Sequence, residues 1–285
     1  MKLILVPTDM SETASHALRY ASALAEKFDA HLLVIYADPF MPPLDFSGSG
    51  VFAVRREDLI DNAREQLEVH VEQNVSKRVP YDIRVITESP VDAILAEACA
   101  TGTDLIVMGT HGRSGLTRLL VGSVTEAIIE LAPVPVIAVN GFSSETPKFT
   151  KVICPVRFTT ASLEALRYAS TFAENTSLLV FRGLERAEVR DAIDELIALE
   201  QWIPKELITR SETQVTPNAA TAEAVVEFAK EKGADLIALG VPASGNLLPK
   251  LLHLSPCPVL TMNERTVRLT VPERKLPVAA VAAAE

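Results

Sequence analysis

Short, continuous apolar runs alternate with longer stretches of mixed polarity along the first half of the chain. Continuous runs of valine, isoleucine and leucine are typical of parallel strands that are buried on both faces. They predict strands near residues 2–7, 31–36, 81–87, 104–109 and 135–139. Between them, apolar side chains recur at helical spacing, which predicts helices near residues 12–27, 56–77, 90–100 and 123–131. The strict alternation predicts an α/β fold with a mostly five-stranded, doubly wound parallel sheet.

The second half of the chain repeats the first. Three segments match in the same order: residues 17–22 with 165–170, 104–106 with 235–237, and 131–136 with 254–259. Ordered self-similarity of this kind indicates two copies of one unit. We therefore expect tandem domains over residues 1–142 and 150–264. The tail, 265–285, lacks a core-forming period, and we expect it to be mobile, with a short terminal helix as the alternative.

The offset between matching segments falls from 148 to 131 and then to 123 residues, and each fall locates a deletion in the second copy. The first deletion fits loss of the long loop 39–55, whose prolines and phenylalanines suggest a lid over a ligand or a surface for a partner. The second deletion falls directly after the fourth strand. It removes the segment on which the functional prediction rests.

That segment of the first copy is rich in glycine. It reads Gly109-Thr-His-Gly112, then nine residues, then Gly122-Ser123-Val124-Thr125. Glycine lets the backbone turn sharply and approach a ligand, and a helix that begins at Ser123 presents unpaired N–H groups to an anion. The hydroxyls of Ser123 and Thr125 could add donors to phosphate oxygens. We expect an anionic ligand here, and specifically a nucleotide.

The same residues also have structural interpretations. A glycine pair after a strand can be only a turn, and Ser123 can be only an N-cap. Asp9, at the end of the first strand, can cap the helix that begins near Ser11. Inside the glycine-rich segment, His111 and Arg113 could donate to phosphate oxygens or remain solvated. These alternatives stay open from the residues alone.

Composition narrows the class of protein. The net charge is −10, from 27 basic and 37 acidic residues, so we expect no nucleic-acid partner. No stretch approaches the roughly 20 apolar residues that span a bilayer, so we expect no membrane segment. Cys99, Cys154 and Cys257 lie far apart and are predicted to be reduced, buried thiols of a cytoplasmic protein. The histidines at 16, 31, 70 and 253 show no metal-ligand spacing.

Together these features resemble the universal stress protein family. Its ATP-binding members carry Gly-x2-Gly-x9-Gly-(Ser/Thr) after the fourth strand and an aspartate at the end of the first. In this chain, the matching residues are Gly109, Gly112, Gly122, Ser123 and Asp9. The resemblance covers both copies and implies a Rossmann-like fold similar to the adenine nucleotide alpha hydrolases. It also implies a stress-response protein that binds ATP, ADP or AMP.

The resemblance further implies roles for individual residues of the first copy. Backbone groups near Pro7, Thr8 and Ala37 would border the adenine, and Met108 could contact the nucleoside or serve only in the core. Asp9 would hold the ribose or a phosphate-bound Mg²⁺, since a carboxylate suits either. The complete expected site is Pro7, Thr8, Asp9, Ala37, Met108, Gly109, His111, Gly112, Arg113, Gly122, Ser123, Val124 and Thr125.

The second copy departs from this pattern. Arg157 stands at the position of Asp9, Val156 at that of Thr8, and Ala243 at that of Gly112. No Gly-Ser pair follows before Leu254. We therefore expect nucleotide binding in the first copy alone.

The expected function is that of a nucleotide-binding protein rather than an established enzyme. No general base stands beside the glycine-rich segment, although weak ATPase activity stays open. The alternative function is a nucleotide-independent interaction scaffold that pairs with itself, as a homodimer, or with a partner protein. A ligase or pyrophosphatase of similar fold is disfavoured, because no Ser-Gly-Gly-x-Asp-Ser loop follows the first strand.

Overall fold

The protein is described by a computed structural model, which places residues 1–39, 56–110, 121–141, 143, 145–172, 176–185, 189–241 and 247–270. The chain forms two compact units. The first comprises Met1–Ile128 and Val136–Pro147, and the second comprises Ile129–Pro135 and Lys148–Glu285. Of the predicted lid loop 39–55, residues 40–55 lie outside the described residues.

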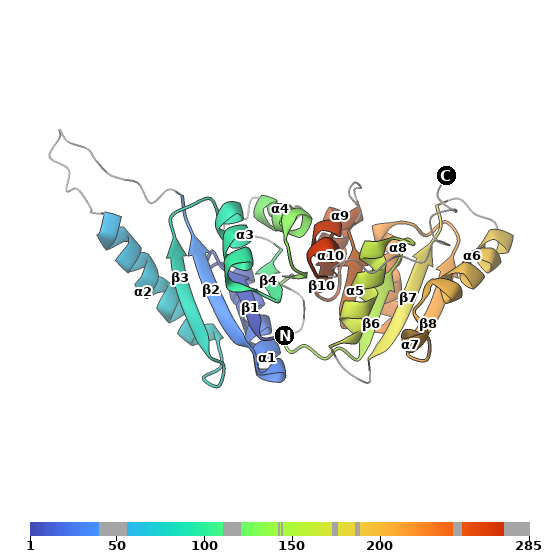
Figure 1. Cartoon of the computed structure of the whole chain (residues 1–285), viewed down its shortest axis with the longest axis horizontal. Coiled ribbons are helices and arrows are strands. Elements are labelled where there is room, and N and C mark those ends of the chain that lie inside the picture. The colour runs from blue at the N-terminus through green and yellow to red at the C-terminus, as the bar shows by residue number, and fades with distance from the viewer. Residues whose placement is uncertain are drawn as a thin grey trace. The chain divides into compact units, whose positions relative to one another are not determined.

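The first unit is built on five parallel strands in the order β3-β2-β1-β4-β5 (Figure 1). The strands are β1 (Leu3–Pro7), β2 (His31–Ala37), β3 (Tyr81–Ile86), β4 (Leu105–Gly109) and β5 (Val136–Val139). The helices are α1 (Glu12–Phe28), α2 (Arg56–Asn74), α3 (Pro90–Thr101) and α4 (Ser123–Leu131). The four residues from Leu105 to Met108 are buried, which is the reason for the unbroken apolar run in the sequence.

The helices of the first unit cover both faces of its sheet. Helix α1 packs on α2 and on β4. Right-handed crossovers place α1 and α2 on one face and α3 and α4 on the other. Helix ends follow local signals: the Ser11 hydroxyl accepts from the N–H of Ala14 at the start of α1, and Gly102, at φ 67°, ends α3.

The second unit repeats this arrangement with the strand order β10-β9-β6-β7-β8. Its strands are β6 (Lys151–Pro155), β7 (Ser177–Gly183), β8 (Ser211–Thr216), β9 (Leu236–Gly240) and β10 (Val259–Met262). Its helices are α5 (Thr160–Ser170), α6 (Val189–Trp202), α7 (Lys205–Ile208), α8 (Ala222–Lys232), α9 (Leu247–Leu254) and α10 (Glu264–Thr270). The predicted α/β fold class, with parallel strands and flanking helices, is confirmed.

The tail begins as helix α10, the alternative that the sequence left open, because the side chain of Asn263 accepts from the N–H of Thr266 at 2.7 Å and caps the first turn. Residues 271–285 lie outside the described part of the chain. One prediction needs correction: Cys99 is not buried but exposed on α3, since Ala93, Ile94 and Ala98 form the buried side of that helix. Within the described residues, no helix is long and apolar enough to cross a membrane.

Candidate functional site

A pocket of about 260 Å³ opens in the first unit at the carboxyl ends of β1 and β4. This is the place where the strand order reverses, and it is the usual ligand position of doubly wound sheets. The lining residues come from both strands, from β2, and from α1, α3 and α4. They are Pro7, Thr8, Asp9, Ala14, Ile35, Ala37, Pro90, Ile94, Met108, Gly109, Gly122, Ser123, Val124 and Thr125.

The structure thus brings most of the expected site residues together around one cavity. Ten of the thirteen line it, although binding by them stays a prediction. His111, Gly112 and Arg113 lie outside the described residues. Sequence reasoning missed Ala14, Ile35, Pro90 and Ile94. Pro90 carried a usable signal, because it opens a helix close after β3, and the carboxyl ends of parallel strands share one edge of the sheet.

The turn between β1 and α1 forms one wall and is held by its own side chains. The Thr8 hydroxyl accepts from the N–H of Met10 at 3.0 Å, and the Asp9 carboxylate accepts from the N–H of Ser11 at 3.0 Å. Met10 has a φ of 61°, a left-handed conformation that costs energy in a residue other than glycine. Ser11, not Asp9, is the N-cap of α1.

The start of α4 forms the opposite wall. The N–H of Gly122 donates to the carbonyl of Thr110 at 2.9 Å, which ties the helix start to the end of β4. The Thr125 hydroxyl donates to the carbonyl of Gly109 at 2.9 Å. In this structure the proton of that hydroxyl goes to the backbone, and the role of Thr125 toward phosphate stays a prediction. The first N–H groups of α4 have no partner within the helix and line the pocket with Ser123 and Val124.

Apolar side chains form the rest of the cavity. Ile35 and Ala37 come from β2, Ile94 comes from α3, and Met108 comes from β4. Apolar walls with a few convergent polar groups are characteristic of small-molecule sites. The pocket therefore combines apolar side chains with hydrogen-bond donors at the start of α4.

His70 stands behind the β1–α1 turn. Its Nε2 atom lies 3.2 Å from the hydroxyl oxygen of Thr8. Burial lowers the pKa of His70, while the charge of Asp9 raises it and that of Arg19 lowers it further. The sequence assigned this histidine no role, and its spacing carried no signal that could have done so.

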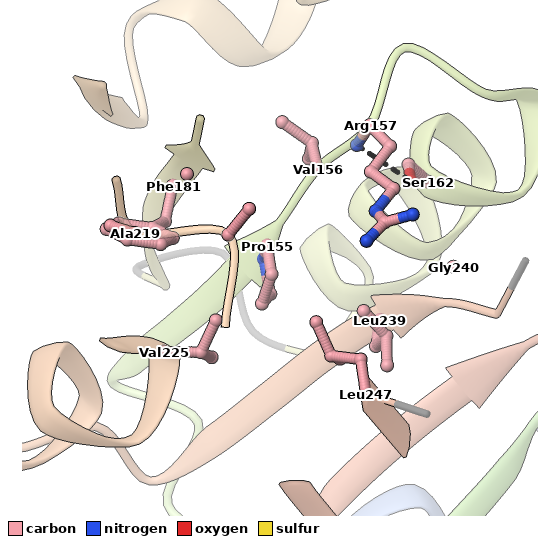
Figure 2. Close-up of a pocket in the computed structure, with 12 residues that line it drawn as sticks. Pro155, Val156, Arg157, Ser162, Phe181, Ala219, Val225, Leu239, Gly240 and Leu247 are labelled. Atoms are coloured by element: carbon pink, nitrogen blue, oxygen red, sulfur yellow. Dashed lines mark hydrogen bonds between the residues drawn. The ribbon is translucent and has the colours of Figure 1, made fainter. Parts of the chain in front are cut away.

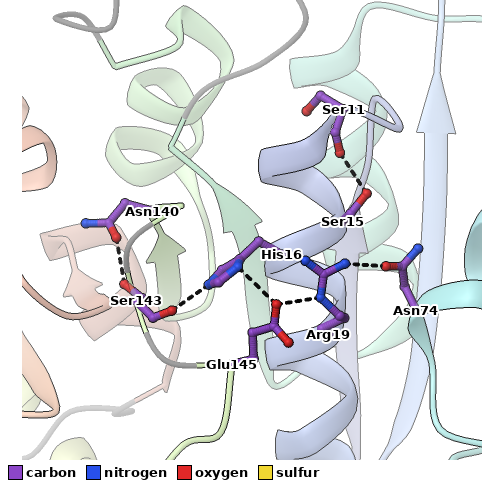
Figure 3. Close-up of polar contacts among 8 residues, drawn as sticks. All are labelled: Ser11, Ser15, His16, Arg19, Asn74, Asn140, Ser143 and Glu145. Carbon is purple, nitrogen blue, oxygen red and sulfur yellow. Dashed lines mark hydrogen bonds and ion pairs between the residues drawn. The ribbon is translucent and has the colours of Figure 1, made fainter.

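A polar network joins α1, α2 and the segment after β5 (Figure 3), and Asn74 links it to His70. The Asn74 amide donates to the carbonyl of His70 at 2.7 Å and accepts from Arg19 at 2.6 Å. Arg19 also donates to Glu145 at 2.6 Å. Glu145 lies 3.3 Å from Nδ1 of His16 as well. The network fixes α2 against α1 and holds the segment that follows β5.

The second unit has a pocket at the equivalent place, but its volume is only about 40 Å³ (Figure 2). That space holds a few water molecules at most, since each needs roughly 10–15 Å³ by this kind of measure. The lining residues are counterparts of those in the first unit: Pro155, Val156, Arg157, Ser162, Phe181, Gly183, Ala219, Ala220, Val225, Leu239, Gly240 and Leu247.

Backbone packing narrows this second pocket, and a separate polar cavity of about 410 Å³ lies beside it, lined by Arg157, Arg182, Gly183, Leu184, Glu185, Asp191, Glu195 and Ala220. Gly183 ends β7 where Ala37 ends β2, and a β-carbon on Gly183 would overlap the carbonyl oxygen of Ala219. The N–H of Ala219 donates to the carbonyl of Leu184 at 2.9 Å, which holds the intruding segment in place. The segment between β8 and α8 therefore occupies the region that stays open beside Ala37.

The start of α5, which follows β6, also lies closer to the end of β9 than the start of α1 lies to the end of β4. A β-carbon on Gly240 would overlap the backbone of Ser162. In the first unit, a β-carbon on Gly109 would lie 3.0 Å from the Cγ2 atom of Thr13. The Ser162 hydroxyl accepts from the N–H of Arg157 at 3.3 Å, and the Arg157 side chain extends along the pocket (Figure 2).

No group of three or more histidine, cysteine, aspartate or glutamate side chains that could hold a metal ion occurs among the residues that the structure places. Asp9 is the carboxylate that lines the pocket of the first unit.

Comparison with known proteins agrees with the fold and shows the family. The model of the universal stress protein family matches residues 1–140. A universal stress protein of Methanocaldococcus jannaschii is 33% identical over 139 residues, which cover 49% of this chain and 82% of that protein. The chain belongs to the universal stress protein family. The resemblance inferred from the glycine motif is thereby confirmed.

Other universal stress proteins extend the comparison. One from Thermus aquaticus is 34% identical over 140 residues, which cover 49% of this chain and 98% of that protein. A solved universal stress protein from Archaeoglobus fulgidus superposes with a TM-score of 0.62 at 20% identity, and the match covers 92% of this chain and 98% of that one. This last likeness concerns the fold, and it extends over both units.

Proposed function

We propose that this universal stress protein binds an adenine nucleotide in the pocket of its first unit and leaves its second unit empty. The observation that carries the proposal is the contrast between two equivalent pockets, of about 260 and about 40 Å³. Only the larger combines apolar walls, a carboxylate and the N-terminus of a helix. The glycine motif of ATP-binding family members follows β4 in that unit.

The walls suggest how the nucleotide lies. The adenine ring fits the apolar side formed by Ile35, Ala37 and Ile94. Phosphate oxygens accept from the N–H groups at the start of α4, where the helix dipole favours negative charge. Asp9 then accepts from the ribose hydroxyls. Of its two expected roles we favour this one, because one Asp9 oxygen already accepts from Ser11, and a Mg²⁺ would be held by phosphate and water.

The biological role proposed with this site is a cytoplasmic response to stress, governed by nucleotide occupancy. Nothing in the proposal requires hydrolysis. The scaffold function remains the alternative, and it differs in needing no nucleotide.

Calorimetric titration with ATP, ADP and AMP tests the proposal. We expect one equivalent to bind and the Gly122→Val variant to lose affinity, because a branched side chain at Gly122 crowds the phosphates. Gly141→Val is the matched control, since a β-carbon at Gly141 meets no atom within 4 Å. Absence of heat with all three nucleotides, or equal binding by Gly122→Val, would overturn the proposal in favour of the scaffold.

A further inference from the structure

A hydrogen-bonding residue outside the pocket lining, His70, contacts a residue of the lining, Thr8. Thr8 lines the pocket and is only 7% exposed. Its hydroxyl oxygen already accepts from the N–H of Met10 at 3.0 Å. The hydroxyl proton therefore points elsewhere, and Nε2 of His70 lies 3.2 Å away. A neutral imidazole with its proton on Nδ1 accepts that hydroxyl proton.

We infer that His70 is a positioning residue for the nucleotide site: it accepts the Thr8 hydroxyl proton and so fixes the turn that carries Asp9. The inference rests on the proposed function, because the turn matters only if Asp9 and Thr8 meet a ligand. His70 itself does not line the pocket. Its effect on the ligand is exerted through Thr8.

Such a turn needs outside support. Met10 holds a left-handed φ of 61°, which costs energy unless the surroundings determine it. The bond from Thr8 to Met10 stabilises this conformation, and His70 fixes the rotamer of Thr8 that makes the bond. The Asn74 amide donates to the backbone carbonyl of His70 at 2.7 Å, and Arg19 in turn donates to Asn74 (Figure 3).

Burial favours the neutral form of His70 at neutral pH. Burial lowers its pKa, and Arg19 on α1 adds to this effect, while Asp9 at the turn opposes it. Strand β3 packs on α2, but its charged Asp82 and Arg84 pair with His31 and Glu97. On α2 itself, the residues one turn away are uncharged: Gln66, Leu67, Gln73 and Asn74. Protonation would leave His70 unable to accept.

The second unit offers an internal contrast. Val156 replaces Thr8 there, so the corresponding position has no hydroxyl to be held. The equivalent pocket has a volume of only about 40 Å³. The hydroxyl-to-imidazole contact thus occurs in the unit whose pocket at this place is larger.

A double-mutant cycle with adenosine as the probe tests the contact. At about pH 8, His70→Leu is expected to weaken adenosine binding about 3- to 10-fold, the effect of one lost hydrogen bond. Thr8→Val should weaken it at least as much, because it also removes the acceptor of the Met10 N–H. The double variant should lose no more than Thr8→Val alone, because His70 acts through Thr8. His70→Gln retains an acceptor and should bind like the wild type. Thermal unfolding of each variant shows whether it is folded.

The pH profile separates positioning from a general structural role. Adenosine carries no phosphate, so its charge does not change over the range. Wild-type affinity for adenosine should fall as pH drops from about 7.5 to about 5, on the acid side of the usual histidine pKa. His70→Gln should abolish this fall. His31→Gln, at the opposite end of β2, is the matched control and should keep the wild-type profile.

Nuclear magnetic resonance supplies a readout on the imidazole itself. Because adenosine is expected to favour neutral His70, reciprocity requires that saturating adenosine shift the His70 titration to lower pH. Additive losses in the cycle, unchanged affinity in His70→Leu, or the wild-type pH profile in His70→Gln would each overturn the inference and leave the proposed function standing. Failure of wild-type protein to bind any adenine nucleotide at about pH 8 would overturn both.

Discussion

The backbone of Ala219 lies so close to Gly183 that a β-carbon on the glycine would overlap the Ala219 carbonyl oxygen. The first unit has Ala37 at the corresponding strand end, and its pocket is open. This approach, together with that of Ser162 to Gly240, distinguishes the two equivalent pockets. Two copies of one fold therefore differ in the space that they leave at the same strand ends.

Substitution of Gly183 should destabilise the second unit. Gly183→Ala forces the backbone of Ala219 to move, and overpacking of this kind costs about 1–3 kcal/mol. Urea unfolding followed by tryptophan fluorescence measures the change, because Trp202, on α6, is the chain's one tryptophan. Gly141→Ala is the control, since its β-carbon meets no atom within 4 Å. Equal midpoints for the two variants would contradict the packing.

A charged side chain follows the first strand of each unit, and its removal should affect nucleotide binding in the first unit only. Asp9→Ala is expected to weaken AMP binding by about 10-fold or more, because hydrogen bonds to a charged group contribute about 1.5–3 kcal/mol. Arg157→Ala makes the equivalent change in the second unit and should leave AMP affinity unchanged. Calorimetry of both variants measures the difference. Loss of affinity in Arg157→Ala would place a ligand in the second unit.

The burial of His70 also gives stability a pH dependence. Since the pKa of His70 is lowered below 6.5 in the folded protein, the folded state binds fewer protons than the unfolded state near that pH. Its contribution is present above 6.5 and is lost as pH falls through the lowered value. Between about pH 8 and pH 5, the free energy of unfolding measured with urea should fall less in His70→Gln than in the wild type. An identical fall in both proteins would contradict this expectation.

The sequence determined the fold class through a small number of patterns. Unbroken runs such as Leu105–Met108 indicated strands buried on both faces, and the repeat indicated two units. Most of the candidate site could also be predicted from the sequence, because the glycine motif and Asp9 both follow strands whose carboxyl ends meet at one edge of the sheet. These are local signals, and each is carried by a few neighbouring residues.

What the sequence could not provide depends on contacts between distant segments. His70 and Thr8 are 62 positions apart, and nothing in the sequence near either residue indicates that they are in contact. The packing of Ala219 on Gly183 likewise depends on the path of the segment between β8 and α8. The commitment of the Thr125 hydroxyl to Gly109 was equally hidden, because a free and a bonded hydroxyl look identical in a sequence.

The three cysteines should differ in reactivity. Burial raises the pKa of Cys154 far above its usual value and that of Cys257 to about 12, whereas Cys99 is exposed. Because the thiolate is the reactive form, an aromatic disulfide reagent should modify Cys99 alone in the native protein and all three thiols after denaturation. Cys99→Ser should abolish the native reaction. Rapid modification of Cys154 in the folded protein would contradict the packing of β6.

Binding to the first unit alone is tested most directly by hydrogen exchange with and without saturating ATP. The two turns that follow β1 and β6, residues 8–11 and 156–159, serve as matched reporters within one molecule. We expect ATP to slow exchange at 8–11 and at the start of α4, 122–125, and to leave 156–159 unchanged. Protection of both turns, or of the second alone, would contradict the account.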